Sequence, residues 1–250
     1  MCVYSPLEQF SILRLLPMSI GCIDVSITNS TIFLLASCFL VTFFLSSLYF
    51  DVKLLSKAWQ NSFEILYLFV LNNIVRENIK SGSNLYFPAL LSLFLFILLC
   101  NLIGMIPYAF TTTSHIVVTF TLALSFFFAI NFIGFSLHGF ALFSLFLPPG
   151  APLIMSPLLV FIEVVSYSFR VVSLSLRLFA NMMSGHCLLK ILAGFSWTMF
   201  SSSNLLCFFH IIPLVIIFCI TGLEFAIAFL QAYVFTLLIC VYLSDAINLH

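Results

Sequence analysis

Charge is scarce in this sequence. Only 6% of its 250 residues are charged, whereas about 25% is usual in soluble domains. Hydrophobic residues make up 63%, and the mean hydropathy is +1.26. These values exclude a soluble globule and indicate an integral membrane protein. The eight basic and eight acidic residues give zero formal net charge and form no basic tract, so we expect no nucleic-acid partner.

Motifs for metal, disulfide and nucleotide chemistry are also missing. The eight cysteines lie mostly inside apolar runs and include no C-x-x-C pair. We therefore interpret them as packing residues and expect neither a metal site nor a disulfide. No glycine-rich phosphate loop of the Walker type occurs, which argues against nucleotide binding.

Apolar runs define the first membrane segments. We expect a crossing at residues 27–50, because about 20 apolar residues span a hydrocarbon core of ~30 Å. At 56–80, apolar residues recur at spacings of three and four, which predicts an amphipathic helix on the membrane surface. A transmembrane hairpin is expected at 87–137. Pro88 lies in the predicted first turn of its first helix, and Pro107 ends that helix.

A long helical hairpin is predicted at residues 153–250, after a rigid proline-rich connector. Its two apolar limbs are 157–199 and 205–243, with a polar turn at 201–204 between them. Most of the first limb would be a helix ~55 Å long, well beyond the ~30 Å core, so we predict a steep tilt. The whole chain, 1–250, is thus predicted to be a single all-α integral membrane domain.

Polar side chains interrupt both limbs at matching distances from the turn. An ionisable group in lipid costs roughly 2.5 to 3.5 kcal/mol on insertion scales, so such groups mark an ion or proton path by default. If the limbs are antiparallel, three pairs lie at three depths. Starting from the turn, these pairs are His186 with Glu224, Arg177 with Gln231, and Glu163 with Asp245.

Helix geometry divides these pairs between two paths. A polar stripe on the first limb holds Glu163, Ser166, Arg170, Ser173, Arg177, Asn181 and Ser184. His186 lies half a turn out of phase with Arg177 and ~13 Å further along the axis. We therefore predict two aqueous paths that leave Arg177 in opposite axial directions.

Some polar residues also have a structural interpretation. We expect Asn101 and Asn131 to form hydrogen bonds between helices, and the serines to bond to their own backbone. Arg170 and Lys190 can snorkel to nearby interfaces, and this alternative stays open beside a functional role. Arg177 is too far from either surface to snorkel easily, which favours a function for it.

The basic residues predict the orientation. One of them, Arg14, precedes the first crossing. Four lie between the first crossing and the hairpin, namely Lys53, Lys57, Arg76 and Lys80. Because basic loops stay on the cytoplasmic side or its organellar equivalent, the N-terminus is predicted outside and the C-terminus inside. Glu163 then lies near the inner surface and His186 toward the outer one.

Five segments carry a more specific pattern. They are SLRLFANMMSGH at 175–186, GLE at 222–224, QAYVF at 231–235, SPLEQF at 5–10 and NLIGMIPY at 101–108. Together they resemble subunit a of the rotary F-type ATP synthase, and in particular its mitochondrial members, over nearly the whole chain. The resemblance implies a membrane stator that faces a ring of c-subunits and is not an enzyme by itself.

The resemblance implies a barrier between the two paths. Arg177 matches the essential stator arginine, Asn181 matches its neighbour in the motif, and Gln231 matches the glutamine beside it. A guanidinium keeps its proton at physiological pH, so it would attract the ionised c-ring carboxylate and block a direct leak.

The resemblance assigns the other residues to two half-channels. His186 and Glu224 match the outer half-channel, in the order of the mitochondrial members, and Glu163 and Asp245 match the inner one. Lys190 stands where some relatives have a second histidine that joins a metal site. We therefore expect no metal and no cofactor.

The implied setting is the mitochondrial inner membrane, with the N-terminus toward the intermembrane space. Expected partners are the c-ring, the peripheral-stalk subunit b, small membrane subunits and lipids, without nucleotide or nucleic acid. Protons would enter by the outer half-channel, ride on the rotating c-ring, leave by the inner half-channel, and so drive ATP synthesis. Residues of the c-subunit choose between proton and sodium, so both ions stay open at this point.

Two other functions remain as alternatives. A secondary ion transporter would show internal repeats with broken helices in matching places, and no repeat is visible between the two halves. A haem-binding respiratory subunit would need histidines that face one another across helices, and the five histidines show no such paired set.

Overall fold

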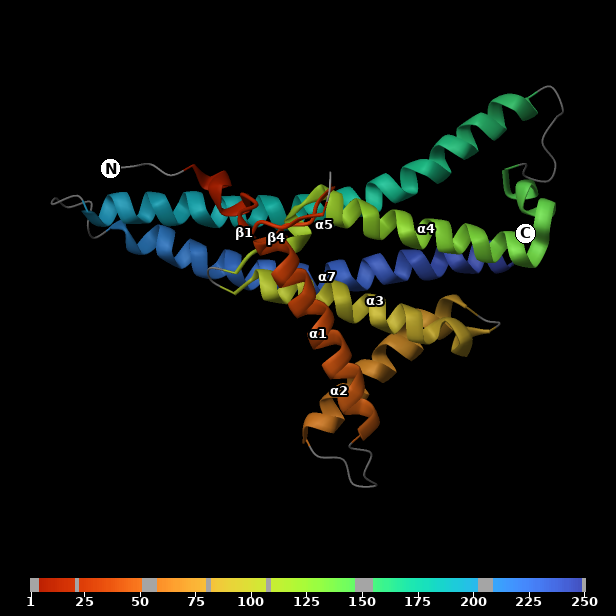
Figure 1. Cartoon of the computed structure of the whole chain (residues 1–250), viewed down its shortest axis with the longest axis horizontal. Coiled ribbons are helices and arrows are strands. Elements are labelled where there is room, and N and C mark those ends of the chain that lie inside the picture. The colour runs from red at the N-terminus through yellow and green to blue at the C-terminus, as the bar shows by residue number, and fades with distance from the viewer. Residues whose placement is uncertain are drawn as a thin grey trace. The chain divides into compact units, whose positions relative to one another are not determined.

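The computed structural model of this chain is built almost entirely from helices (Figure 1). It describes residues 5–20, 23–50, 58–79, 82–106, 109–146, 155–201 and 209–248. Among these residues, five helices are long and apolar enough to cross a membrane: Asn29–Ser46, Ser83–Gly104, Ile116–Leu142, Ser156–Ser201 and Ile211–Ile247. The prediction of an all-α, multi-pass membrane protein is confirmed.

Short strands precede the first membrane helix. After a 3-10 helix at Pro6–Phe10, the antiparallel pairs are β1 (Arg14–Leu16) with β4 (Ile27–Thr28) and β2 (Ser19–Ile20) with β3 (Ile23–Asp24). The helix α1 is Asn29–Phe50, so it starts two residues later than predicted. Thr28 and Thr31 cap this end reciprocally, because each backbone N–H donates to the other's Oγ1, at 3.0 and 3.4 Å.

The amphipathic segment packs one face on protein. α2 is Ala58–Phe69, and a π-helix continues it at Val70–Arg76. Its buried side chains are Val70, Leu71, Ile74 and Val75. The ring of Phe69 lies 5.9 Å from that of Tyr233. The predicted apolar stripe is present, although protein covers part of it. The first two residues and the last residue of the range 56–80 lie outside the described residues.

The helix α3 begins earlier than the sequence predicts. It is Ser83–Gly104, so Pro88 lies in its second turn and not in its first. Gly82 precedes it with a φ of +75°, a conformation that favours glycine. Pro88 is exposed and lacks only the N–H that would bond to the carbonyl of Asn84, so the helix continues through it. Pro107, the predicted stop, lies outside the described residues.

Two long helices form the C-terminal part. α5 is Ser156–Ser201, with 46 residues, and α7 is Ile211–Ile247, with 37 residues. At 1.5 Å per residue they are ~69 and ~55 Å long, about twice a ~30 Å hydrocarbon core. The first predicted limb is therefore helical throughout, the second is helical from Ile211, and its residues 205–208 lie outside the described residues. The steep tilt stays a prediction. Most of the predicted turn at 201–204 lies outside the described residues.

The helix α4 runs beside the end of α7. It is Ile116–His138, and Gly139 ends it with a φ of +56° before a 3-10 segment at Gly139–Phe146. Nε2 of His138 lies 2.8 Å from the carbonyl oxygen of Ile247. Figure 1 shows the two helices side by side, in green and blue. The predicted proline-rich connector lies outside the described residues.

The chain forms two compact units. Unit 1 combines Met1–Thr42, Phe96–His115 and Leu178–Gln231. Unit 2 combines Phe43–Leu95, Ile116–Arg177 and Ala232–His250. Along the chain, α5 passes from unit 2 to unit 1 directly after Arg177, and α7 passes from unit 1 to unit 2 directly after Gln231. Each long helix therefore contributes to both units.

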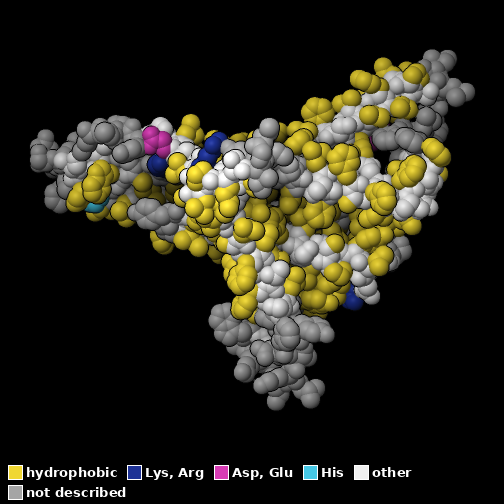
Figure 2. Space-filling view, in the orientation of Figure 1, with side chains coloured by type: hydrophobic (Ala, Val, Ile, Leu, Met, Phe, Trp, Pro, Cys, Tyr) yellow, Lys and Arg dark blue, Asp and Glu magenta, His cyan; other side chains and the backbone are white. Residues whose placement is uncertain are grey.

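Hydrophobic side chains dominate the surface of the described helices (Figure 2). Two phenylalanines illustrate this, because Phe132 is 76% exposed and Phe218 is 79% exposed. Soluble monomers rarely expose apolar surface on this scale, whereas helices in lipid do so along their length. The surface therefore agrees with the membrane class.

Candidate functional site

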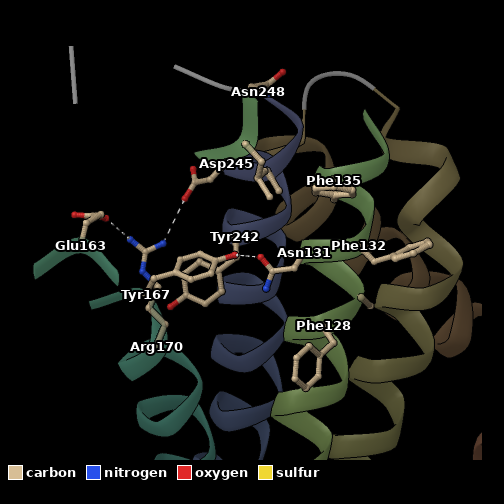
Figure 3. Close-up of a pocket in the computed structure, with 13 residues that line it drawn as sticks. Phe128, Asn131, Phe132, Phe135, Glu163, Tyr167, Arg170, Tyr242, Asp245 and Asn248 are labelled. Atoms are coloured by element: carbon tan, nitrogen blue, oxygen red, sulfur yellow. Dashed lines mark hydrogen bonds and ion pairs between the residues drawn. The ribbon is translucent and has the colours of Figure 1, made fainter. Parts of the chain in front are cut away.

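Three charged side chains meet in unit 2 (Figure 3). In the guanidinium of Arg170, Nη2 lies 3.8 Å from Oε1 of Glu163, and Nη1 lies 3.9 Å from Oδ2 of Asp245. Glu163 and Arg170 are seven residues apart on α5, which places them on one face two turns apart. Side chains of a helix lean toward its N-terminus, so Arg170 reaches back toward Glu163. Asp245 comes from the end of α7.

Aromatic and amide side chains surround this guanidinium. Cζ of Arg170 lies 5.6 Å from the ring centroid of Tyr167 and 5.2 Å from that of Tyr242, which is the range of cation–π contacts. The hydroxyl of Tyr167 donates a 2.7 Å hydrogen bond to Oδ1 of Asn131 on α4. The expectation that Asn131 bonds between helices is confirmed, and three helices contribute to the cluster.

The same side chains line a cavity of about 930 Å³, which we call the unit 2 cavity. Its wall on α4 is aromatic and includes Phe128, Phe132 and Phe135. The side chain of Arg170 is 31% exposed, whereas the side chains of Glu163 and Asp245 are 39% and 53% exposed. The acids are therefore more exposed than the cation that pairs with them.

A second cavity, the unit 1 cavity, has a volume of about 760 Å³. His186 and Lys190 of α5 line it, together with Thr221 and Glu224 of α7. A smaller cavity of about 240 Å³ is also lined by His186 and Glu224, and by Asn181. The structure thus brings the predicted His186 and Glu224 pair to the same cavities.

Glu224 packs against the bare backbone of α5. A Cβ at Gly185 would lie 2.5 Å from Oε1 and 2.9 Å from Cδ of Glu224, so only glycine leaves room for this carboxyl group. Both carboxylate oxygens of Glu224 and Nε2 of His186 are buried, with no hydrogen-bond partner among the described residues. Buried polar atoms rarely lack a partner, so these atoms are suited to bind water.

A buried amide lies one helical turn from this carboxyl group. Nδ2 of Asn101 on α3 donates a 3.3 Å hydrogen bond to the carbonyl oxygen of Ala228. Ala228 follows Glu224 by four residues, on the same face of α7. Oδ1 of Asn101 is buried and has no partner among the described residues. The expectation that Asn101 bonds between helices is confirmed, and α3 joins the unit 1 cluster.

His115 adds a titratable group in the connection between α3 and α4. Its ring stacks on that of Phe110, with centroids 5.1 Å apart and an interplanar angle of 18°. Burial lowers the pKa of this imidazole, because the charged form loses water. Burial therefore favours the neutral form of this imidazole.

The three remaining predicted residues lie where the long helices pass from one unit to the other. Arg177 is exposed, and within unit 2 its guanidinium has no hydrogen bond or ion pair with a described residue. Asn181 is half-buried, and its carbonyl accepts a 3.3 Å hydrogen bond from Oγ of Ser184. Gln231 is half-buried and ends the unit 1 part of α7. Its pairing with Arg177 stays a prediction.

Known proteins match this chain along almost its whole length. The family model described as ATP synthase A chain matches residues 30–244. The chain belongs to the ATP synthase A chain family. ATP synthase subunit a of Chondrus crispus is 52% identical over 248 residues, which cover 99% of this chain and 98% of that protein. The proteins of that name from Marchantia polymorpha and Brassica napus are 49% and 50% identical to this chain. Each alignment covers 98% of this chain, together with 99% of the Marchantia polymorpha protein and 97% of the Brassica napus protein.

In this member of the ATP synthase A chain family, two of the three predicted pairs come together. Glu163 and Asp245 contact the same guanidinium. His186 and Glu224 both line each of the two unit 1 cavities. The antiparallel register predicted from the turn therefore holds inside each unit. The roles of these residues in proton transfer stay predictions.

Sequence reasoning left the role of Arg170 open and overlooked Tyr167 and Tyr242. A signal was available, because each tyrosine lies three residues before a charged residue of the cluster, Arg170 on α5 and Asp245 on α7. The two tyrosines are also equally distant from the predicted turn. The guanidinium of Arg170 contacts two acids and two aromatic rings. A side chain that only snorkels to the interface needs none of these contacts.

Proposed function

We propose that this chain is the proton-translocating stator subunit of a rotary ATP synthase, and that it is not an enzyme by itself. Its relatives bear the name ATP synthase subunit a. The observation that carries the proposal is a pair of cavities, one in each unit, that contain the predicted ionisable residues and share no lining residue among those the structure describes. A rotary stator needs two such paths, because one continuous pore would pass protons without turning the ring.

The unit 1 cavity takes up protons from the intermembrane side in this proposal. Imidazole and carboxyl groups are the usual carriers of protons in proteins, and His186 and Glu224 provide one of each. Their buried atoms without protein partners suit contact with water. From this cavity the proton passes to a carboxylate of the c-ring.

Arg177 separates the two paths. Its guanidinium stays charged at any physiological pH and is exposed, so it can attract an ionised carboxylate of the passing ring. The same permanent charge repels a proton that would otherwise cross directly between the paths. The resemblance gives Asn181 and Gln231 the role of orienting this guanidinium.

The unit 2 cavity releases protons to the matrix side. Glu163 and Asp245 are its two acids, and both are open to the cavity. A proton that leaves the ring reaches water through these acids. Rotation follows, because each ring carboxylate is loaded in one cavity and unloaded in the other, and rotation drives ATP synthesis in the soluble head.

We place residues 1–250 in the mitochondrial inner membrane as one membrane domain, with the N-terminus toward the intermembrane space. The exposed apolar faces of the helices contact lipid. The c-ring is the partner of the face that carries Arg177, and the peripheral-stalk subunit b and small membrane subunits cover other faces. This mechanism uses no nucleotide, nucleic acid, metal or cofactor on this chain.

Replacement of Arg177 by alanine tests the stator role. In the assembled complex, Arg177→Ala should reduce proton-driven ATP synthesis to less than about a tenth of the normal rate, because the charge that attracts the ring carboxylate is gone. ATP hydrolysis by the soluble head should remain. Arg76→Ala is the matched control, since this exposed arginine donates, among the described residues, a single side-chain hydrogen bond, to Oδ1 of Asn72. Normal synthesis by assembled Arg177→Ala would refute the proposal.

Cysteine labelling tests the separation of the half-channels. In a background without native thiols, cysteines at 163 and 245 should react with a membrane-impermeant reagent added on the matrix side. Cysteines at 186 and 224 should react from the intermembrane side only. Labelling of position 163 from the intermembrane side would show an inverted topology or a continuous pore, and either result contradicts the two-path scheme.

A further inference from the structure

Arg170 is the one cation among the described residues that line the unit 2 cavity, and the proposed proton path does not use it. Two nitrogens of its guanidinium face different acids, one on α5 and one on α7. Neither contact is bidentate, so each carboxylate keeps an oxygen free for water or for a proton. Arg170 therefore links the two helices without blocking either acid.

The surroundings of Arg170 hold its guanidinium behind the two acids. The rings of Tyr167 and Tyr242 flank it, one from each long helix. Tyr167 is itself fixed by the hydrogen bond of its hydroxyl to Asn131. The side chain of Arg170 is also the least exposed of the three charged groups. The carboxylates thus lie on the open side of the cluster and the cation on the covered side.

The charges of this cluster add up to a site for one proton. Two ionised carboxylates and one guanidinium leave a net charge of −1, and a single proton on either acid neutralises the cluster. Close carboxylates disfavour a second ionised form unless a cation compensates it. The other titratable groups among the described residues that line the cavity are Tyr167 and Tyr242. The lining residues of α4 and of the 3-10 segment carry no titratable group.

We propose that Arg170 is the positioning residue of the inner path. It turns Glu163 and Asp245 toward the water of the cavity, and its charge lets the two acids together bind one proton. The inference rests on the proposed function, because the proton concerned is the one that leaves the ring. It assigns to a second arginine, two turns from Arg177 on the same face of α5, a role distinct from the barrier. One arginine faces the ring, and the other faces the exit acids.

The test is the dependence of ATP synthesis on matrix-side pH in vesicles that contain the whole complex. With the outer pH fixed, Arg170→Gln should move the half-maximal rate to higher matrix-side pH by about one unit, because acids without their cation release protons less readily. Arg170→Lys keeps a cation and should move the profile much less, although it cannot face both acids with separate planar nitrogens. Arg76→Gln is the control and should leave the profile unchanged.

A charge exchange separates this role from simple packing. Arg170→Asp alone should reduce ATP synthesis strongly, because three acids then share the cavity without a cation. Combined with Asp245→Arg, the cluster again has two acids and one cation, and the pH profile should return toward that of the unaltered complex. A packing role predicts the reverse, since the double substitution disturbs the contacts of both helices and would be worse than either single one.

Each outcome decides the inference. A normal pH profile in assembled Arg170→Gln, or a failure of the charge exchange to recover any synthesis in assembled complex, would overturn it. If Arg170→Gln does not assemble, the Lys variant and the charge exchange carry the same test. The stator function itself would stand in either case, because it fails only if Arg177→Ala continues to make ATP.

Discussion

The two cavities contain acids of the same chemistry but satisfy them in opposite ways. In unit 2, one guanidinium contacts both acids, and Asn131 accepts the hydrogen bond of Tyr167. In unit 1, the carboxyl group of Glu224 and Nε2 of His186 have no partner among the described residues. Among the described residues, every buried side-chain nitrogen or oxygen without a hydrogen-bond partner lies in unit 1. These atoms belong to Asn101, Thr113, His115, His186 and Glu224.

In the proposed mechanism, this difference sets how each path handles a proton. A buried polar group without a partner costs about 1 to 3 kcal/mol, so the unit 1 groups depend on water for their stability. In the proposed mechanism, water in that cavity also brings protons to Glu224. In unit 2, the protein itself supplies the compensating charge, so the acids are oriented before a proton arrives. Substitutions should therefore act very differently in the two units.

The largest effect should come from neutralising the acid that has no protein partner. Glu224→Gln removes the one acid among the described residues that line the unit 1 cavity, so ATP synthesis should fall by an order of magnitude or more. Glu163→Gln leaves Asp245 beside Arg170, so its loss should be only about twofold to fivefold. The measurement is ATP synthesis per assembled complex in vesicles. Equal losses in the two variants would remove the contrast between the units.

A smaller effect should follow from filling the space beside Glu224. Gly185→Ala would place a methyl group 2.5 Å from Oε1 of Glu224, which is too close for the present position of this flexible side chain. The carboxyl group must move, so synthesis should fall, although less than in Glu224→Gln. Gly194→Ala on the same helix is the matched control, because nothing lies within 4 Å of its added Cβ. Unchanged synthesis in Gly185→Ala would show that the position of this carboxyl group does not matter.

The smallest effect should come from the hydroxyl of Tyr167. Tyr167→Phe keeps the ring beside Arg170 but loses the hydrogen bond to Asn131, a net loss of about 0.5 to 1.5 kcal/mol. Thermal unfolding of the complex should shift slightly downward, and synthesis should stay within about twofold of normal. A loss as large as that of Glu163→Gln would mean that the hydroxyl takes part in proton release and does more than hold the ring.

Much of the architecture could be predicted from hydropathy and spacing. The apolar runs that predicted the crossings are helices, because each run is long enough for its average hydropathy to outweigh single polar residues. The register of α5 and α7 was also predictable, since a helix rises by a constant 1.5 Å per residue. That rule correctly paired Glu163 with Asp245 and His186 with Glu224.

Local departures were not predictable from the same signals. The pairing of β1 with β4 delays the start of α1, and Gly82 lets α3 begin before Pro88. The π-helix in the amphipathic segment has no counterpart in the pattern of apolar residues. Each departure depends on a few hydrogen bonds or on one backbone conformation. Such local features do not appear in a hydropathy averaged over about 20 residues.

The sequence by itself determined the membrane class, the helical segments and the levels of the polar residues, because these follow from sums over many residues and from a constant helical rise. The tertiary structure alone decided that Arg170 faces both Glu163 and Asp245 and that Glu224 lies against Gly185 without a partner. Ion pairs and hydrogen bonds form only within a few ångströms. Which residues come that close depends on how the helices rotate and pack, and spacing along the chain does not contain that information.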